Sequence, residues 1–209
     1  MTDRPIIFSG SMVRALLEGR KTQTRRLLKP QPGEGHSAYL YPTANVDWQV
    51  RNKMGVVLSS ERLPFTLGDR LYVRENFCVL KSTNPNKPEI ETVFQASDED
   101  FPCKWKPSIH MPRAASRITL TVEAVKVERV QDVSEGDAKA EGVEMEGTGT
   151  GRIDVHGHEI EQESYKLGFS TIWERLNAKR APWDSNPWVV AVSFSVVKAN
   201  IDSLKSEAA

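Results

Sequence analysis

Apolar residues recur at helical spacing in three stretches of the chain. The first, Met12–Leu17, ends at Gly19, because glycine tolerates the positive φ at which many helices stop. The second opens at Ser134, a good N-cap residue, and runs through Glu141. The third covers Tyr165–Leu176. The residues of this third helix that we expect to face inward are Leu167, Ile172, Trp173 and Leu176.

Alternation of apolar and polar residues predicts strands in much of the remaining chain. The longest is Ser116–Arg129, Asn186–Val197 is the last, and Arg70–Phe77 alternates cleanly. Shorter strands are expected at residues 22–28, 47–51, 56–59 and 92–95. Many short strands, few helices and no regular alternation of strand and helix predict an α+β fold. We expect a small, mostly antiparallel β-barrel flanked by short helices.

The same patterns give a domain organisation. Residues 1–199 are expected to form a single domain, a size that can bury a core. Gly147–His158 is rich in glycine and lacks periodicity, which predicts a mobile insertion around residues 144–163. Residues 200–209 are expected to be a C-terminal tail.

Composition excludes some classes of protein and leaves others open. The 209 residues carry no formal net charge, but residues 1–30 hold seven Lys or Arg against two acidic residues, so a basic face could hold phosphate. The only two cysteines, Cys78 and Cys103, form no C-x-x-C pair, and we expect neither a metal site nor a cofactor. No long apolar run is present, so we expect a cytoplasmic protein with no membrane partner.

The most unusual segment is Leu17–Arg26, where a lysine, threonines and arginines surround one glycine. A cationic turn that bears hydroxyl groups is suited to binding an anion or activating a hydroxyl. Lys21 and Thr24 are three residues apart and would face opposite sides of a straight strand. A shared site therefore needs Lys21 in the turn after Gly19, or a bulge in the strand.

A second cluster of polar side chains lies in Trp105–Arg117. Its two prolines favour an extended segment, in which Trp105 could stack on a base and the cations could donate hydrogen bonds. The alternative is a connecting loop with surface cations. Arg26 and the Arg74-Glu75 pair have a similar alternative, an internal ion pair without contact to a ligand.

Four motifs in order resemble the ASCH domain family, and most closely its phage and prophage branch. They are Gly19-Arg20-Lys21-Thr22-x-Thr24-x-Arg26, Gly68–Glu75, Ile118–Val127 followed by Asp137-Ala138-x-Ala140-Glu141-Gly142, and Trp183-x-x-Asn186-Pro187-Trp188-Val189. The resemblance covers residues 4–197 apart from insertions near 81–90 and 144–163. It implies a PUA-like fold, a small β-barrel associated with RNA and modified nucleosides. Ala114 departs from the tryptophan common in the branch.

The resemblance also implies an activity and a set of site residues. Amidohydrolases of N4-acetylcytidine in this family have a catalytic lysine, threonine and glutamate that match Lys21, Thr24 and Glu141. Lys21 would be the base. Glu141 would orient Lys21, protonate the leaving amine or hold the cytosine edge, and the first and third roles are preferred because a carboxylate opposes loss of the lysine's proton. The residues expected to bind substrate are Arg20, Arg26, Trp105, Lys106, His110, Arg113 and Arg117.

Other interpretations stay open at this point. Other family members are a ribonuclease and non-catalytic RNA-binding modules, so the expected partner is a nucleoside or RNA, bound by a monomer or a dimer. Taken singly, Lys21 is typical of a solvated cation, Thr24 of a strand residue and Glu141 of an exposed helix end.

Overall fold

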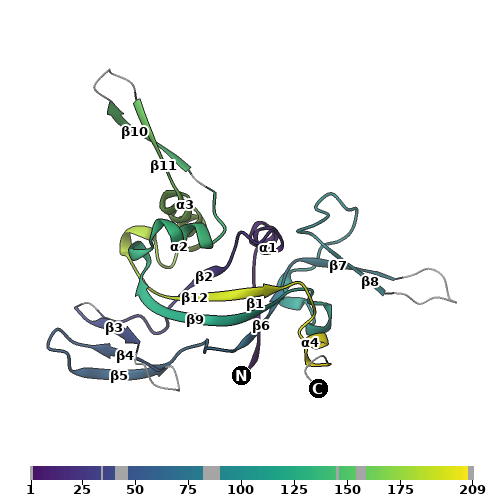
Figure 1. Cartoon of the computed structure of the whole chain (residues 1–209), viewed down its shortest axis with the longest axis horizontal. Coiled ribbons are helices and arrows are strands. Elements are labelled where there is room, and N and C mark those ends of the chain that lie inside the picture. Colours follow the sequence, from purple (N-terminus) through teal and green to yellow (C-terminus); the bar gives the residue numbers. More distant parts are fainter. Residues whose placement is uncertain are drawn as a thin grey trace. The chain divides into compact units, whose positions relative to one another are not determined.

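The computed structural model describes residues 2–33, 35–40, 47–81, 90–144, 146–153 and 159–206. In this part of the chain the fold is α+β, with many strands and few short helices (Figure 1). The α+β prediction is therefore confirmed. The longest described helix has 13 residues, and no described helix combines the length and apolarity that a membrane crossing requires.

The regular elements are short. The helices are α1 (Gly10–Leu17), α2 (Glu135–Ala140), α3 (Tyr165–Asn177) and α4 (Ser203–Ser206), with 3₁₀ turns η1 (Ser108–His110), η2 (Arg113–Ala115), η3 (Val130–Asp132) and η4 (Trp183–Ser185). The strands are β1 (Asp3–Ile7), β2 (Gln23–Leu27), β3 (Ser37–Leu40), β4 (Asp47–Arg51), β5 (Val57–Arg62), β6 (Arg70–Arg74), β7 (Phe77–Lys81), β8 (Ile90–Phe94), β9 (Thr119–Arg129), β10 (Glu146–Ile153), β11 (Glu159–Ser164) and β12 (Trp188–Val197).

The main sheet has five strands in the order β1-β6-β9-β12-β2. The pair β1 and β6 is parallel, whereas β6 pairs with β9, and β12 with β2, in antiparallel fashion. Because this order has two ends, the described strands form no closed barrel. Smaller sheets are formed by β3-β4-β5, β7-β8 and β10-β11.

The chain divides into two compact units, each assembled from separate segments. Unit 1 comprises Met1–Gly19, Leu67–Glu123 and Phe194–Ala209, and unit 2 comprises Arg20–Thr66 and Ala124–Ser193. The sequence predicted one domain over residues 1–199, and the two boundaries within the main sheet fall inside β9 and β12.

In unit 2, α2 and α3 pack on an apolar cluster. Its buried members are Val130, Val133, Ala138, Val143, Phe169, Trp173 and Val189. The indole Nε1 of Trp173 donates to the carbonyl oxygen of Ala181 at 2.9 Å, so this large ring is buried without an unpaired donor. The inward face of α3 therefore contains Phe169 and Trp173, and the prediction that Leu176 faces inward is wrong, since this residue is 51% exposed.

Several sequence predictions of elements are confirmed, and others need correction. Ser134 caps α2 by accepting from the Asp137 N–H at 3.1 Å, as expected. The expected strand Arg70–Phe77 ends at Arg74, and a second strand begins at Phe77. Residues 146–153 and 159–164 form an antiparallel hairpin where no regular structure was expected (Figure 1). Residues 145 and 154–158 of the predicted mobile insertion lie outside the described residues.

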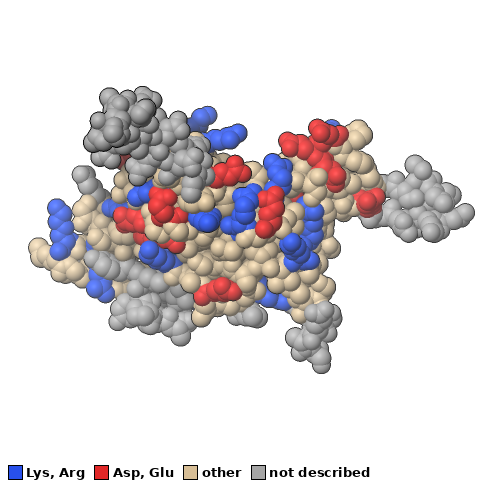
Figure 2. All heavy atoms as spheres, turned by 45° about the horizontal axis from the view of Figure 1, so that its top comes forward, with Lys and Arg blue, Asp and Glu red and all other residues tan. Residues whose placement is uncertain are grey.

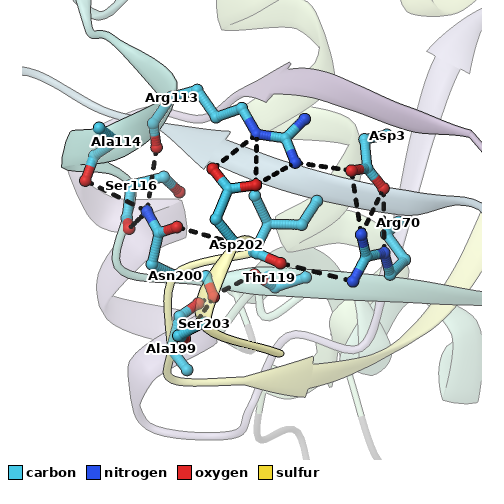
Figure 3. A network of polar contacts seen from close by, with 11 residues as sticks. Asp3, Arg70, Arg113, Ala114, Ser116, Thr119, Ala199, Asn200, Asp202 and Ser203 are labelled. Carbon is cyan, nitrogen blue, oxygen red and sulfur yellow. Dashed lines mark hydrogen bonds and ion pairs between the residues drawn. The ribbon is translucent and has the colours of Figure 1, made fainter. Parts of the chain in front are cut away.

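Residues 200–202, at the start of the expected C-terminal tail, make specific contacts within unit 1. The side-chain amide of Asn200 donates to the carbonyl oxygens of Arg113, Ala114 and Ser116 at 3.0, 3.2 and 2.7 Å (Figure 3). Ile201 is fully buried. A single apolar residue after a polar one gives no periodic signal, so the pattern of the sequence could not identify this anchor.

Burial of Ile201 predicts that this segment stabilises unit 1. Truncation in Ile201→Ala removes buried methyl groups and leaves a cavity, so we expect the free energy of unfolding to fall by about 2 to 5 kcal/mol. The measurement is urea unfolding of the purified protein. The matched control is Val197→Ala, at a position 37% exposed, which should lose much less. Equal losses in the two variants would show that the segment does not anchor the unit.

Candidate functional site

The end of α2 and the start of β2 place a lysine against a glutamate in unit 2. The Nζ of Lys21 lies 2.7 Å from Oε2 of Glu141 and donates to the carbonyl oxygen of the same residue at 2.8 Å. The two side chains are 0% and 4% exposed. The interpretations of Lys21 as a solvated cation and of Glu141 as an exposed helix end are therefore wrong.

Local backbone structure explains why these two residues meet. Helix α2 ends at Ala140 with Glu141 as its C-cap, and Gly142 adopts a φ of 78° that turns the chain away. The N–H of Thr22 donates to the carbonyl oxygen of Ala140 at 2.8 Å, and Lys21 pairs with Glu141 in an isolated bridge. Lys21 thus satisfies a carbonyl group that the helix end leaves without an intrahelical partner.

Burial changes the acid–base behaviour of Lys21. Removal of its amine from water lowers the pKa of Lys21 below the ordinary 10.5, and the nearby charges of Arg26 and Arg25 lower it further. The carboxylate of Glu141 acts in the opposite direction, but burial is the larger effect. A lysine with a lowered pKa can accept a proton closer to neutral pH, as a catalytic base must.

A buried arginine connects this pair to two further carboxylates. The side chain of Arg25 is 1% exposed, and its Nη1 lies 3.3 Å from Oε1 of Glu141. Its Nη2 lies 2.7 Å from Oε1 of Glu128 and 3.3 Å from Oδ2 of Asp137. Glu141 therefore binds Lys21 through one oxygen and Arg25 through the other.

Arg25, Glu128 and Asp137 were not among the residues that the sequence predicted for the site. A signal was present for Glu128, because it shares the parity of Leu120 and Val122 in β9. A carboxylate on the same face of a strand as buried apolar residues indicates a buried charge that needs a partner. That partner is Arg25 on β2, and sequence spacing alone could not identify it.

Thr24 is buried on β2, opposite Val192 of β12. In the part of the chain that the structure describes, its hydroxyl makes no hydrogen bond with Lys21 or Glu141. Lys21 lies before β2, which begins at Gln23, so the alternation of that strand does not fix the direction of the lysine side chain. The expected joint site of the three residues is therefore seen for Lys21 and Glu141, whereas the role of Thr24 stays a prediction.

Two predicted substrate-binding arginines also lie in unit 2. Arg20 is exposed, and its Nη1 donates to the carbonyl oxygen of Gly142 at 2.8 Å. Arg26 lies on β2 opposite Val190, and burial lowers the pKa of Arg26, against the opposing effect of Glu141. Both arginines are thus next to the residues of the Lys21–Glu141 pair.

The other predicted substrate-binding residues lie in unit 1. Arg113 donates to both carboxylate oxygens of Asp202 at 2.6 to 3.2 Å and to Asp3 at 2.6 Å (Figure 3). Arg117 forms a bidentate pair with Glu75 at 2.9 and 3.0 Å. These two arginines have structural partners, which weakens the prediction that they bind a ligand.

The sequence analysis considered an internal ion pair between Arg74 and Glu75. Glu75 does form an internal ion pair, but with a different arginine. Glu75 is paired with Arg117, and the guanidinium of this arginine lies 4.1 Å from the centre of the Phe94 ring. Arg74 instead donates to the carbonyl oxygen of Ile109. Local sequence order suggested the neighbouring arginine, whereas the fold brings the distant Arg117 to Glu75.

The remaining predicted substrate-binding residues are Trp105, Lys106 and His110. Trp105 is half-buried. Lys106 and His110 are exposed, as is Lys104. The backbone of Lys106 is paired with Phe77 through hydrogen bonds of 2.7 and 3.2 Å, which hold this segment against the start of β7.

Surface charge and metal-binding groups add little to the site. On the face drawn in Figure 2, basic and acidic side chains are interspersed. Among the described residues, no group of three or more His, Cys, Asp or Glu side chains could hold a metal ion. A cavity in unit 2 is lined by Gly35, His36, Asn52, Lys53 and Met54, none of which is a candidate residue.

Comparisons of the chain with protein-family models, with curated proteins and with solved structures find no match. The Lys21–Glu141 pair and the motifs of the sequence are the features that bear on function.

The lowered pKa of Lys21 predicts how stability depends on pH. Between its value in the folded protein and the ordinary 10.5, the unfolded chain binds more protons than the folded one. The free energy of unfolding therefore rises with pH across this window and levels off above it. In Lys21→Met this rise should be absent, as measured by urea unfolding at a series of alkaline pH values.

The matched control is Lys104→Met, which removes an exposed lysine and should keep the wild-type slope. A wild-type slope in Lys21→Met would mean that folding does not lower the pKa of Lys21.

Proposed function

We propose that this protein is an amidohydrolase that removes an N4-acyl group from cytidine, with Lys21, Thr24 and Glu141 as its reacting side chains. The observation that carries the proposal is the buried contact of 2.7 Å between the Lys21 amine and the Glu141 carboxylate. The resemblance of the motifs to the ASCH family supports the substrate class, and a PUA-like fold is part of the same proposal.

The chemistry requires a nucleophile, a base and a group that orients the base. The hydroxyl oxygen of Thr24 attacks the acyl carbon while Lys21 accepts the hydroxyl proton. The bond from the acyl carbon to N4 then breaks, and the Lys21 ammonium returns the proton to N4 as cytidine leaves. Water hydrolyses the acyl ester on Thr24 to release the carboxylic acid.

Glu141 is assigned the role of orienting Lys21. Its Oε2 faces the amine, and its Oε1 is occupied by Arg25, so neither oxygen is directed at a substrate in this structure. Of the two roles preferred from the sequence, orientation of the base therefore agrees better with the geometry than binding of the cytosine edge.

Burial of the pair means that a substrate needs a local opening. The exposed neighbours are Arg20, which binds the carbonyl oxygen of Gly142, and Asp137, whose side chain is partly exposed beside Arg25.

The test is release of cytidine from N4-acetylcytidine by the purified protein. Loss of the base in Lys21→Met should lower kcat by about 10²- to 10⁴-fold. Thr24→Val removes the nucleophile and should lower kcat at least as much. The matched control is Thr22→Val, at an exposed threonine two residues away, which should keep wild-type turnover.

Absence of turnover by the wild-type protein, or turnover that survives in Lys21→Met, would remove this function.

A second candidate, a non-catalytic RNA-binding module, is favoured by the surroundings of Trp105. A half-buried indole beside exposed Lys104, Lys106 and His110 is suited to stacking on a base next to a phosphate. This candidate makes the Lys21–Glu141 pair a structural feature.

The two candidates differ in a binding experiment with single-stranded RNA. If RNA binding is the function, Trp105→Ala should weaken binding by about 1 to 3 kcal/mol per stacked base, and affinity should fall steeply as salt is raised. Glu141→Gln should then leave the affinity unchanged. An RNA affinity that changes neither with salt nor in Trp105→Ala would reject this second candidate.

A further inference from the structure

The proposed reaction uses Lys21, Thr24 and Glu141, but the most highly connected side chain of the buried cluster is Arg25. Besides the three carboxylates, its Nη1 lies 2.6 Å from Oε1 of Gln23, and its guanidinium carbon lies 5.7 Å from the centre of the Phe169 ring. A side chain held by five neighbours has little freedom to change its rotamer.

These contacts fix the orientation of one carboxylate. Arg25 holds Oε1 of Glu141, so the other oxygen, Oε2, is directed at Nζ of Lys21. Gln23 orders the guanidinium from the same strand, and Glu128 holds it from β9 through Nε at 2.9 Å. The carboxylate of Glu141 is thus placed by a group that does not contact the amine.

The charges around Lys21 determine which group of the cluster can lose a proton. The groups that face the cluster are Glu141 and Asp137 from α2 and its end, Arg25 and Arg26 from β2, and Glu128 and Lys126 from β9. An arginine keeps its proton in a protein, whereas a buried lysine can lose it. Arg25 therefore places a positive charge beside Glu141, while burial lowers the pKa of Lys21.

We propose that Arg25 is a positioning residue that holds Glu141 by one carboxylate oxygen so that the other orients Lys21, and that it thereby sets the pH range in which the site turns over. The turnover part of this inference rests on the proposed function. The orientation part concerns the resting protein and can be tested without a substrate.

The test follows the protonation of the Lys21 amine by NMR of protein labelled with ¹⁵N on the lysine side chains. Arg25→Gln removes a positive charge near Lys21, and it leaves Glu141 with Lys21 as its cationic partner at this contact. Both changes favour the ammonium form of Lys21. We expect the titration midpoint of Lys21 to rise by about one pH unit. The acid limb of the turnover profile should move in the same direction.

Two further variants make the result specific. Arg25→Lys keeps the charge with fewer donors and should shift the midpoint less than Arg25→Gln, and it serves as the test if Arg25→Gln does not fold. Lys139→Gln removes an exposed cation of α2 and should leave the midpoint at the wild-type value.

The outcomes separate the two proposals. A midpoint that moves in Arg25→Lys, where the charge is kept, supports the positioning role, and if the wild-type protein also never releases cytidine, the proposed function is removed. Normal turnover with an unchanged midpoint and an unchanged pH profile in both Arg25 variants overturns the positioning role and leaves the function intact.

Discussion

Burial of the Lys21 amine against the Glu141 carboxylate is the interaction around which the charged side chains of unit 2 are arranged. An ion pair out of water is stable only if the remaining donors and acceptors are also satisfied. The carbonyl oxygen of Glu141 gives Nζ of Lys21 a second acceptor, and the guanidinium of Arg25 gives Oε1 of Glu141 a donor, because α2 ends where β2 begins. The capped start of α2, its glycine stop and the backbone link from Thr22 to Ala140 all serve to fix this one junction.

An ion pair of this kind is a poor choice if stability alone is required. Replacing a buried pair by apolar side chains of similar volume is often neutral or stabilising, by up to about 4 kcal/mol. Unit 2 nevertheless contains Lys21, Arg25, Glu128 and Glu141 as buried charges beside an ordinary apolar cluster. Chemistry that needs a desolvated amine gives a reason to keep them. In unit 1, by contrast, Arg113 and Arg117 pair with carboxylates that are themselves part of the framework.

The sequence predicts those parts of the fold that local patterns determine. Helix α3, strands β4 and β9, the Ser134 cap and the end of α1 near Gly19 all follow from periodicity, caps and glycine conformation. The hairpin of β10 and β11 and the anchor at Ile201 do not, because their stability comes from pairing and burial that no short window contains.

The same distinction applies to the candidate site. Lys21 and Glu141 could be predicted to meet because the motifs resemble a family with those residues in one site. The pairing of Arg25 with Glu128 depends on two strands that are far apart in the sequence. Arg117 and Glu75 are also distant in the sequence, and both lie just outside strands. Sequence order favoured the adjacent arginine for Glu75, whereas the tertiary fold determines the actual partner.

The central claim is that a desolvated amine beside a carboxylate is retained here for reaction and not for folding. The most direct measurement is the rate of cytidine release from N4-acetylcytidine by the double variant Lys21→Met/Glu141→Gln, made on protein whose urea unfolding has been compared with wild type. We expect this double variant to fold, to be at least as stable as the wild-type protein, and to release no cytidine above the uncatalysed rate. A double variant that hydrolyses the nucleoside as fast as the wild-type protein would contradict it.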